Sequence, residues 1–382
     1  MFRKVEDRIL YRDPRHYASF PALAALPDGE VLLLLRRARD QRWFARALGA
    51  AGDKELMRVD HVDSRSQLVL HRFGPDLMPS AEPPLVLPPD AEAADQDANM
   101  LAFRDGSVLV TSFCWYPVAA RYGELLRSRG IGVIGSAEET GTLFLFWGGH
   151  SRLGTDGGRT WTPHNFLPPI PGVPDIVPGA RPHHGGAIRG RAVELPDGRV
   201  LQATYAYGST GRRGSHLFET RDRGASWRYA GPIAHDPDGT ACFVEPALQL
   251  TASGRLICFH RTEDMGDKLV TCASDDLGAS WSDWTAHEMI GHPHDPLRLR
   301  DGRFLLVYGY RHPPYGIRAR LYDPDRERPE AVPEIIVRDD AAGPDVGYPS
   351  AVELADGRVL VAYYFVDADG IRHVAGSVLE MT

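Results

Sequence analysis

Several histidines of this sequence stand in groups that could carry out acid–base chemistry. His183 and His184 are adjacent, and His292 lies just before the pair His294 and Asp295. Imidazole titrates near neutral pH and can therefore give or take a proton, or bind a polar substrate. His292, His294 and Asp295 could also hold a metal ion, but their spacing is loose for a dedicated site. We therefore predict no metal and no cofactor.

A short repeated phrase indicates the elements that must position such groups. Gly154–Trp161 (GTDGGRTW), Thr220–Trp227 (TRDRGASW) and Ser274–Trp281 (SDDLGASW) all read Asp-x-Gly-x-Ser/Thr-Trp. The Asp and hydroxyl side chains suit hydrogen bonds to turn backbone, the glycine suits a positive φ, and the tryptophan offers apolar surface for packing. We interpret these Asp boxes as structural turns, so their acids are structural rather than catalytic: Asp156, Asp222 and Asp276.

A longer repeat accompanies the Asp boxes. Six segments read apolar strand, tight turn, apolar strand, and five of the turns are Asp-Gly, which is a strong hairpin signal. The segments are 21–37, 99–115, 187–207, 245–262, 295–311 and 348–365. Runs such as VLLLLRR are too continuously apolar for strands with one solvated face, so we expect burial on both faces. A third strand follows each hairpin, and a fourth follows all but the last.

This order predicts an all-β fold in which residues 1–382 form a single six-bladed β-propeller with four antiparallel strands per blade. The N-terminal RKVEDRILY could supply the missing last strand and close the ring. In such a blade, the start of the first strand and the loop after the second strand lie on one face of the ring. The hairpin turns and Asp boxes lie on the other face. Polar residues at the first two places, including Asp97, should therefore converge at one mouth of the channel.

With its Asp boxes and six repeats, the chain resembles the sialidase (neuraminidase) superfamily over essentially its whole length. The resemblance implies a tyrosine nucleophile paired with a glutamate, an aspartic acid/base, and three arginines that bind the substrate carboxylate. A carboxylate on the anomeric carbon repels an anionic nucleophile, so a neutral phenol activated by a base takes its place. Arginine suits the carboxylate because its planar guanidinium donates paired hydrogen bonds.

The resemblance gives these roles to particular residues. Tyr348, in GYPSAVELADG, lies where the nucleophile is expected, and Glu245, in VEPALQL, resembles its activating glutamate. Asp63 resembles the acid/base, with Asp60 as the alternative. Further substrate contacts are expected from residues at the same mouth: Arg261, either Arg311 or Arg318, Asp97, His183, His184, His292 and His294.

Two positions depart from the family pattern. The first arginine of the family sits in a Tyr-Arg-Ile-Pro phrase, whereas YASFP here has Ser19 (or Ala18) in its place. The glutamate that usually orients this arginine is replaced by Tyr364. The joint loss is consistent, because a buried glutamate without its arginine would be an unpaired charge. The departures argue against plain sialic acid as the substrate.

We therefore expect a sialidase-like glycoside hydrolase that releases a terminal acidic sugar, such as a uronate or an unusual ulosonic acid, from a glycan with retention. One alternative is a polysaccharide lyase acting on a uronate-containing glycan. The other is a non-catalytic propeller that binds glycans.

Composition excludes several other classes of partner. A net charge of −8 argues against nucleic acid and anionic membranes. We interpret the cluster Arg36, Arg37 and Arg39 as solvated surface.

The N-terminus lacks the apolar stretch of a signal peptide and no segment has transmembrane length, so we predict a cytoplasmic protein unless a signal has been removed. The 4 cysteines lack metal-type spacing and are expected to be buried thiols.

Overall fold

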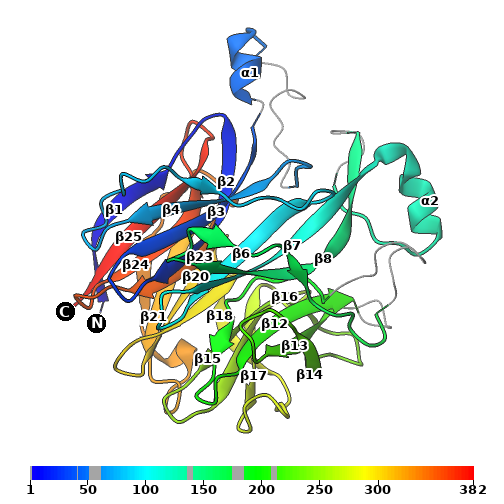
Figure 1. Cartoon of the computed structure of the whole chain (residues 1–382). Coiled ribbons are helices and arrows are strands. Elements are labelled where there is room, and N and C mark those ends of the chain that lie inside the picture. The colour runs from blue at the N-terminus through cyan, green and yellow to red at the C-terminus, as the bar shows by residue number, and fades with distance from the viewer. Residues whose placement is uncertain (1, 41, 51–61, 136–140, 174–184, 208–212) are drawn as a thin grey trace.

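The computed structural model shows six antiparallel sheets arranged as blades around a common centre (Figure 1). It describes residues 2–40, 42–50, 62–135, 141–173, 185–207 and 213–382. Within these residues five sheets have four strands and the second blade has five. The predicted six-bladed β-propeller is confirmed.

The blades follow one another along the chain. Blade I contains β2 (His16–Ala25), β3 (Val31–Arg39), β4 (Gln67–Phe73) and β5 (Leu85–Val86). Blade II contains β6 (Ala94–Ala102), β7 (Val108–Ala119), β8 (Thr142–Thr155), β9 (Thr160–Trp161) and β10 (Asn165–Phe166). Blade III contains β11 (Val193–Glu194), β12 (Val200–Tyr207), β13 (Arg213–Thr220) and β14 (Arg228–Ala234).

The remaining blades have the same order. Blade IV contains β15 (Cys242–Leu250), β16 (Leu256–Glu263), β17 (Lys268–Ser274) and β18 (Thr285–Ile290). Blade V contains β19 (His294–Arg298), β20 (Phe304–Tyr310), β21 (Gly316–Tyr322) and β22 (Glu334–Arg338). Blade VI contains β23 (Gly347–Glu353), β24 (Val359–Val366), β25 (Arg372–Met381) and β1 (Phe2–Tyr11). The short helices α1 (Arg42–Ala47) and α2 (Gly123–Ser128) lie in connections outside the ring (Figure 1).

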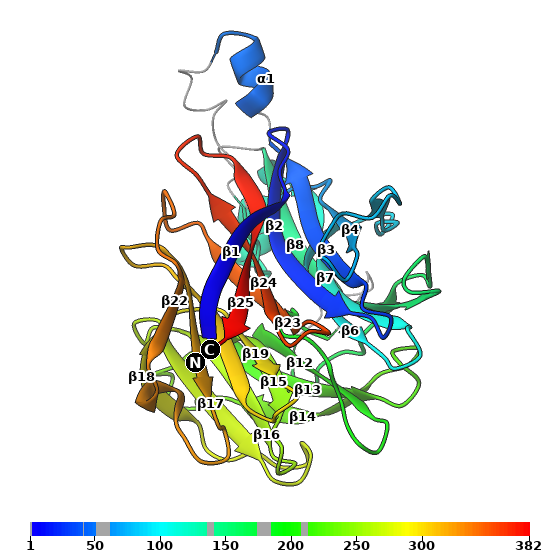
Figure 2. The same cartoon turned by 90° about the vertical axis from the view of Figure 1, so that its left-hand side faces the viewer.

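The N-terminal strand closes the ring as predicted. β1 pairs with β25 in antiparallel register from Phe2 opposite Met381 to Tyr11 opposite Val374. Figure 2 shows the two strands side by side with both termini at the same edge of the molecule. Blade VI is therefore built from both ends of the chain.

Apolar side chains between neighbouring blades form the core. In β3, Leu33 and Leu35 pack toward blade VI, while Leu32 and Leu34 pack toward blade II. All four leucines are fully buried, and burial of each contributes about 1.5–3 kcal/mol. The continuous apolar run thus reflects a strand with two buried faces, as expected.

The Asp boxes are hydrogen-bonded turns. In the second box, Asp222 accepts bonds from the Thr220 hydroxyl (2.7 Å) and the Ser226 amide (2.8 Å). Gly224, at φ 87°, donates its amide to Thr220. Asp276 makes the same contacts in the third box. The carboxylates thus hold turn backbone, in agreement with a structural role.

Two further features are the state of the cysteines and the length of the helices. The four cysteines are free and buried, as expected. Among the described residues, no helix is both long and apolar enough to cross a membrane.

Candidate functional site

Bulges in the first strands shape the centre of the ring. The strand register shifts at the same place in β2, β6, β15 and β23, where one extra residue stands opposite the second strand. Three bulged residues have a left-handed backbone: Phe20 (φ 52°), Glu245 (φ 50°) and Tyr348 (φ 48°). A non-glycine residue in this region costs about 1–3 kcal/mol. Bulges re-aim side chains and are frequent next to active sites.

Two of these bulged residues meet across the ring. The Tyr348 hydroxyl donates a hydrogen bond to the Glu245 carboxylate. Arg261 Nη1 lies 3.1 Å from Glu245 Oε2 and 3.4 Å from Tyr348 Oη. Blade V separates blade IV, which carries Glu245 and Arg261, from blade VI, which carries Tyr348. The contact is therefore made at the centre of the ring.

Electrostatics fixes the protonation of this pair. Burial raises the pKa of Tyr348 well above its usual value, and Glu245 raises it further, so the phenol is neutral. Burial alone would also raise the pKa of Glu245, but Arg261 and the bond from Tyr348 outweigh it and lower the pKa to about 2. The pair is thus a neutral phenol bonded to an ionised carboxylate at neutral pH.

Aromatic packing holds the phenol in place. The rings of Phe20, Tyr348 and Tyr364 form one buried cluster, with the Phe20 and Tyr348 centroids 4.7 Å apart in an edge contact. Phe20 occupies the isoleucine position of the Tyr-Arg-Ile-Pro phrase. The bulges of blades I and VI therefore support each other.

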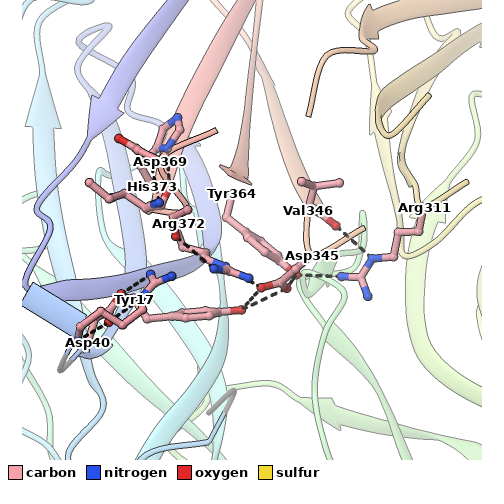
Figure 3. A network of polar contacts seen from close by, with 12 residues as sticks. Tyr17, Asp40, Arg311, Asp345, Val346, Tyr364, Asp369, Arg372 and His373 are labelled. Atoms are coloured by element: carbon pink, nitrogen blue, oxygen red, sulfur yellow. Dashed lines mark hydrogen bonds and ion pairs between the residues drawn. The ribbon is translucent and has the colours of Figure 1, made fainter. Parts of the chain in front are cut away.

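Tyr364 organises a second part of the site, shown in Figure 3. Arg311 Nη2 donates to the Tyr364 hydroxyl at 2.8 Å, and this hydroxyl donates to Asp345 at 2.9 Å. Asp345 also accepts bonds from Tyr17 (3.0 Å) and Arg372 (2.9 Å). Tyr364 thus stands where a glutamate was expected from the family pattern, and it positions Arg311.

Arginines surround Tyr348 from several blades. The guanidinium carbons of Arg189 and Arg311 lie 5.0 Å and 5.3 Å from the centre of the Tyr348 ring. Arg189 also donates to the Pro349 carbonyl at 3.0 Å. Such cation–π contacts stabilise buried guanidinium groups next to an aromatic ring. Of the two predicted alternatives for the third arginine, Arg311 is the one that contacts the tyrosine.

Arg36 was misjudged from the sequence, because it is fully buried rather than solvated. It lies opposite Ser19 in the register of β2 and β3, as Arg261 lies opposite Val244 in blade IV. Its guanidinium carbon is 5.8 Å from the Phe20 ring. A signal was present in the sequence, since Arg36 follows Pro21 at the same interval as Arg261 follows Pro246. Arg189 had no such signal.

Asp97 lies buried among these charges, with only 4% of its surface exposed. Burial raises its pKa to about 7; Arg189, Arg36 and Arg261 act against the shift and Glu245 adds to it. This carboxyl therefore changes its charge near neutral pH, which is the property required of a general acid or base.

The other predicted residues lie elsewhere or have other partners. Asp63 pairs with Arg39 at 3.2 Å and caps the Arg65 amide at 2.7 Å. Arg318 donates to the Pro314 carbonyl at 3.2 Å and faces Glu334 of the outer strand β22 at 3.6 Å. Its assignment as a substrate contact has no support from these contacts. Asp60, His183 and His184 lie outside the described residues.

Two histidines lie at the start of blade V, and they have different surroundings: His292 lies near the site, and His294 packs in the core. His292 lies 3.3 Å from Asp267, and burial together with Arg261 and Arg311 lowers its pKa to about 4. His294 packs against Tyr308, with ring centroids 5.7 Å apart. Asp295 is held by Arg191 (3.0 Å) and by the Ala351 amide (2.7 Å). Asp295 is thus committed to an ion pair with Arg191 and to the backbone of blade VI.

Positively charged side chains gather around the Tyr348–Glu245 pair in the described part of the chain. Arg189, Arg261 and Arg311 lie next to Tyr348. Guanidinium groups in such a place suit an anionic ligand, because they donate paired hydrogen bonds to it. The chemistry available is therefore anion binding next to a phenol–carboxylate pair.

Comparisons with known proteins agree with the fold. The chain matches the model of a BNR repeat-like domain over residues 117–361. A crystal structure of a protein of unknown function from Dyadobacter fermentans is 34% identical, with a TM-score of 0.86, and the match covers 100% of this chain and 99% of that one. A search of curated proteins found no match.

Sialidases share the fold at much lower identity. A Hadza microbial sialidase is 14% identical with a TM-score of 0.63, and the match covers 95% of this chain and 65% of that one. A Trypanosoma rangeli sialidase, in a covalent intermediate with 2,3-difluorosialic acid, is 13% identical with a TM-score of 0.62 and coverage of 98% and 59%. The family model spans more than half of the chain, so this protein belongs to the BNR repeat-like family and has the sialidase-like six-bladed propeller fold.

Proposed function

We propose that this protein is a retaining glycoside hydrolase that releases a terminal acidic sugar from a glycan. The observation that carries the proposal is the Tyr348–Glu245 pair, bonded across the ring next to three arginines, which are Arg189, Arg261 and Arg311. A propeller of the same fold, the Trypanosoma rangeli sialidase, forms a covalent intermediate with a fluorinated sialic acid.

In the first step, Tyr348 Oη attacks the anomeric carbon while Glu245 accepts the phenol proton. The phenol alone is a weak nucleophile because burial raises its pKa. Glu245 is bonded to the proton that must leave, and Arg261, 3.4 Å from Oη, stabilises negative charge that develops on the oxygen. Water then attacks the anomeric carbon of the aryl glycoside formed with Tyr348 and gives one proton to the carboxylate that protonated the leaving group. The bond from this carbon to Oη breaks, and Tyr348 regains its proton from Glu245.

The departing glycosidic oxygen needs a proton, and two carboxyls compete for this role. Asp97 is buried next to the pair, and its pKa of about 7 leaves it largely protonated in mildly acidic solution. Asp63, the acid/base implied by the family pattern, is bonded to Arg39 instead. We assign the role of acid to Asp97 and keep Asp63 as the alternative that mutagenesis separates.

The acidic group of the substrate would be bound by Arg261 and Arg311, with Arg36 and Arg189 adding to the positive field. Guanidinium forks donate paired hydrogen bonds to a carboxylate. Uronates and ulosonic acids both carry such a group next to the ring oxygen. The substrate class is therefore a glycoside of one of these acids.

The first test is hydrolysis of a panel of aryl glycosides of glucuronic, galacturonic and ulosonic acids, with neutral aryl glycosides as controls. On a substrate that the wild type cleaves, we expect Tyr348→Phe and Glu245→Gln to lose activity by about 10²-fold or more. Tyr229→Phe is the matched control, because Tyr229 lies on the outer strand β14 and its hydroxyl is hydrogen-bonded to His216 rather than to any residue of the site. Full activity of both site variants would refute the mechanism.

The same panel separates the two alternatives. A lyase gives an unsaturated product that absorbs in the near ultraviolet, and the arginines would then neutralise the uronate carboxylate. A binding protein shows affinity for acidic glycans without turnover. Either result contradicts the hydrolase proposal while leaving the anion-binding site in place.

A further inference from the structure

A second cluster of titratable groups lies inside blade II. Asp95 begins the bulge of β6, His150 lies in β8, and His164 directly precedes β10. The Asp95 Oδ1 atom is 3.5 Å from His150 Nε2 and 3.7 Å from His164 Nε2. Asp95 and His150 are fully buried, and one ligand atom from each of the three residues lies within 4.8 Å of the others.

These atoms lack other partners among the described residues. Both oxygens of Asp95, both ring nitrogens of His150 and Nε2 of His164 have no hydrogen-bond partner within bonding geometry in that part of the chain. Buried polar groups are normally bonded, and each exception calls for an explanation such as an ion. Asp95, His150 and His164 all carry such atoms, and one ligand atom of each lies within 4.8 Å of the others, so the three form one cluster rather than separate exceptions.

The surroundings enclose this point on one side with apolar atoms. The ring centroids of His150 and His164 are 4.4 Å apart in an edge-to-face contact. The centroid of the Phe166 ring lies 5.7 Å from that of His150 and 6.2 Å from that of His164. Arg152 acts on Asp95 through its charge, but its guanidinium donates to the carbonyls of Thr162 (3.0 Å) and Pro88 (2.8 Å). Among the described residues, no arginine donates a hydrogen bond to the Asp95 carboxylate.

The ligand types and spacing match a transition-metal centre. Two imidazoles and one carboxylate are a common set for zinc, with bonds of about 2.0–2.1 Å and a tetrahedral arrangement. Such bonds place neighbouring ligand atoms about 3.3 Å apart. The observed 3.5 Å and 3.7 Å differ from this by a few tenths of an ångström. The third pair, the ligand atoms of His150 and His164, lies within 4.8 Å.

We propose that Asp95, His150 and His164 form a binding site for one divalent transition-metal ion, zinc being the best match, with a fourth position left for water or another ligand. From the sequence we predicted no metal, with only His292, His294 and Asp295 considered as ligands, and this proposal departs from that prediction. The new site joins β6, β8 and the segment before β10. A metal ion bound there would also hold the start of the β6 bulge at Asp95, and Asp97 follows two residues later in the same bulge.

A plain cluster of one carboxylate and two imidazoles is the rival explanation, and the geometry argues against it. The two Nε2 atoms lie 3.5 Å and 3.7 Å from Asp95 Oδ1, and none of these three atoms has a partner within hydrogen-bond geometry among the described residues. A metal ion would bind all three groups at once.

The test is metal content and binding of the full chain. Protein treated with a chelator is titrated with ZnSO₄ by calorimetry, and with CoCl₂ followed by visible absorption. We expect one ion per chain, a visible absorption spectrum of cobalt bound to nitrogen and oxygen, and a Tm that rises with free zinc. No binding of either ion to wild type, with an unchanged Tm, would overturn the proposal.

Variants then locate the ion. His164→Gln and Asp95→Asn should weaken zinc binding about 10²-fold or more and abolish the rise in Tm. The matched control is His71→Gln, because His71 is also a histidine with an unbonded Nε2 but lies on β4 of blade I. Zinc affinity in His164→Gln equal to that of wild type would place the ion elsewhere and refute the site. Because wild-type stoichiometry is measured directly, a variant that fails to fold does not hide the answer.

Discussion

At the scale of single residues, Asp97 links the site to pH. Its pKa of about 7 means that the carboxyl is protonated below this pH and ionised above it. If Asp97 is the general acid, the rate must fall as pH rises through 7. In Asp97→Asn the activity falls at all pH values and this limb disappears, whereas Asp63→Asn keeps the limb. The measurement is the pH profile of kcat/KM on the substrate found by the glycoside panel.

The same residue predicts a stability effect with a defined sign. The pKa of Asp97 is raised on folding, so the folded state holds a proton that the unfolded state has lost between about pH 4 and 7. As pH rises through this range, the free energy of unfolding should decrease by at most about 1.4 kcal/mol per pH unit. Asp97→Asn removes the titrating group, so its urea unfolding curve should be less pH-dependent than that of wild type. An identical pH dependence in the two proteins would contradict the raised pKa.

A substitution of Arg36 tests whether this arginine contributes to the binding of an acidic substrate. It lies opposite Ser19, the position of the missing family arginine, and it acts on Asp97. We expect Arg36→Lys to raise KM for an acidic glycoside about tenfold while kcat changes less, because the lysine keeps charge but loses the paired donors. Arg37→Lys is the control, since Arg37 is only half-buried and donates to Gln67. Equal KM values for all three proteins would exclude Arg36 from substrate binding.

At the scale of elements, the Asp boxes separate stability from chemistry. Asp222 holds its turn through Thr220 and Ser226, far along blade III from Tyr348. Asp222→Ala should therefore lower the free energy of unfolding by about 1–2 kcal/mol and leave kcat/KM unchanged. Asp275→Ala is a suitable control, because Asp275 is exposed and makes one surface ion pair with Arg255. A loss of activity at unchanged stability would contradict the structural role.

The elements also show what the sequence could reveal. Asp-Gly turns between continuous apolar runs located the hairpins, because those signals are local. Strand starts were less predictable: β2 begins at His16, before Pro21, and β15 begins at Cys242, before Pro246. The prolines made these strand starts hard to recognise, because proline is rare inside a strand and here each strand continues through a bulge next to it. Likewise Asp95 and His150 meet through the pairing of β6, β7 and β8, and His164 is brought to them by the pairing of β10 with β8. No local spacing could therefore indicate them.

At the scale of the whole molecule, ring closure couples the first strand to the site. β1 is the outer strand of blade VI, and Tyr348 lies on β23, the inner strand of the same blade. Phe2 is buried against the core shared by blades V and VI. Arg12, just after β1, pairs with Asp367 at 2.7 Å. Removal of residues 2–11 therefore exposes an edge of β25 and withdraws apolar contacts from the blade that carries the phenol.

We expect the variant lacking residues 2–11 to lose several kcal/mol of stability and to bind acidic glycans weakly, because blade VI no longer fixes Tyr348 against Phe20. A circular permutant provides the control. It joins the neighbouring termini (Figure 2) by a short Gly-Ser linker and opens the chain at the exposed turn Asp197-Gly198. This protein keeps every strand pair, so its Tm and ligand affinity should approach those of wild type. A truncated protein as stable and active as wild type would show that the ring needs no closing strand, and that blade VI holds its tyrosine through β23 and β24 alone.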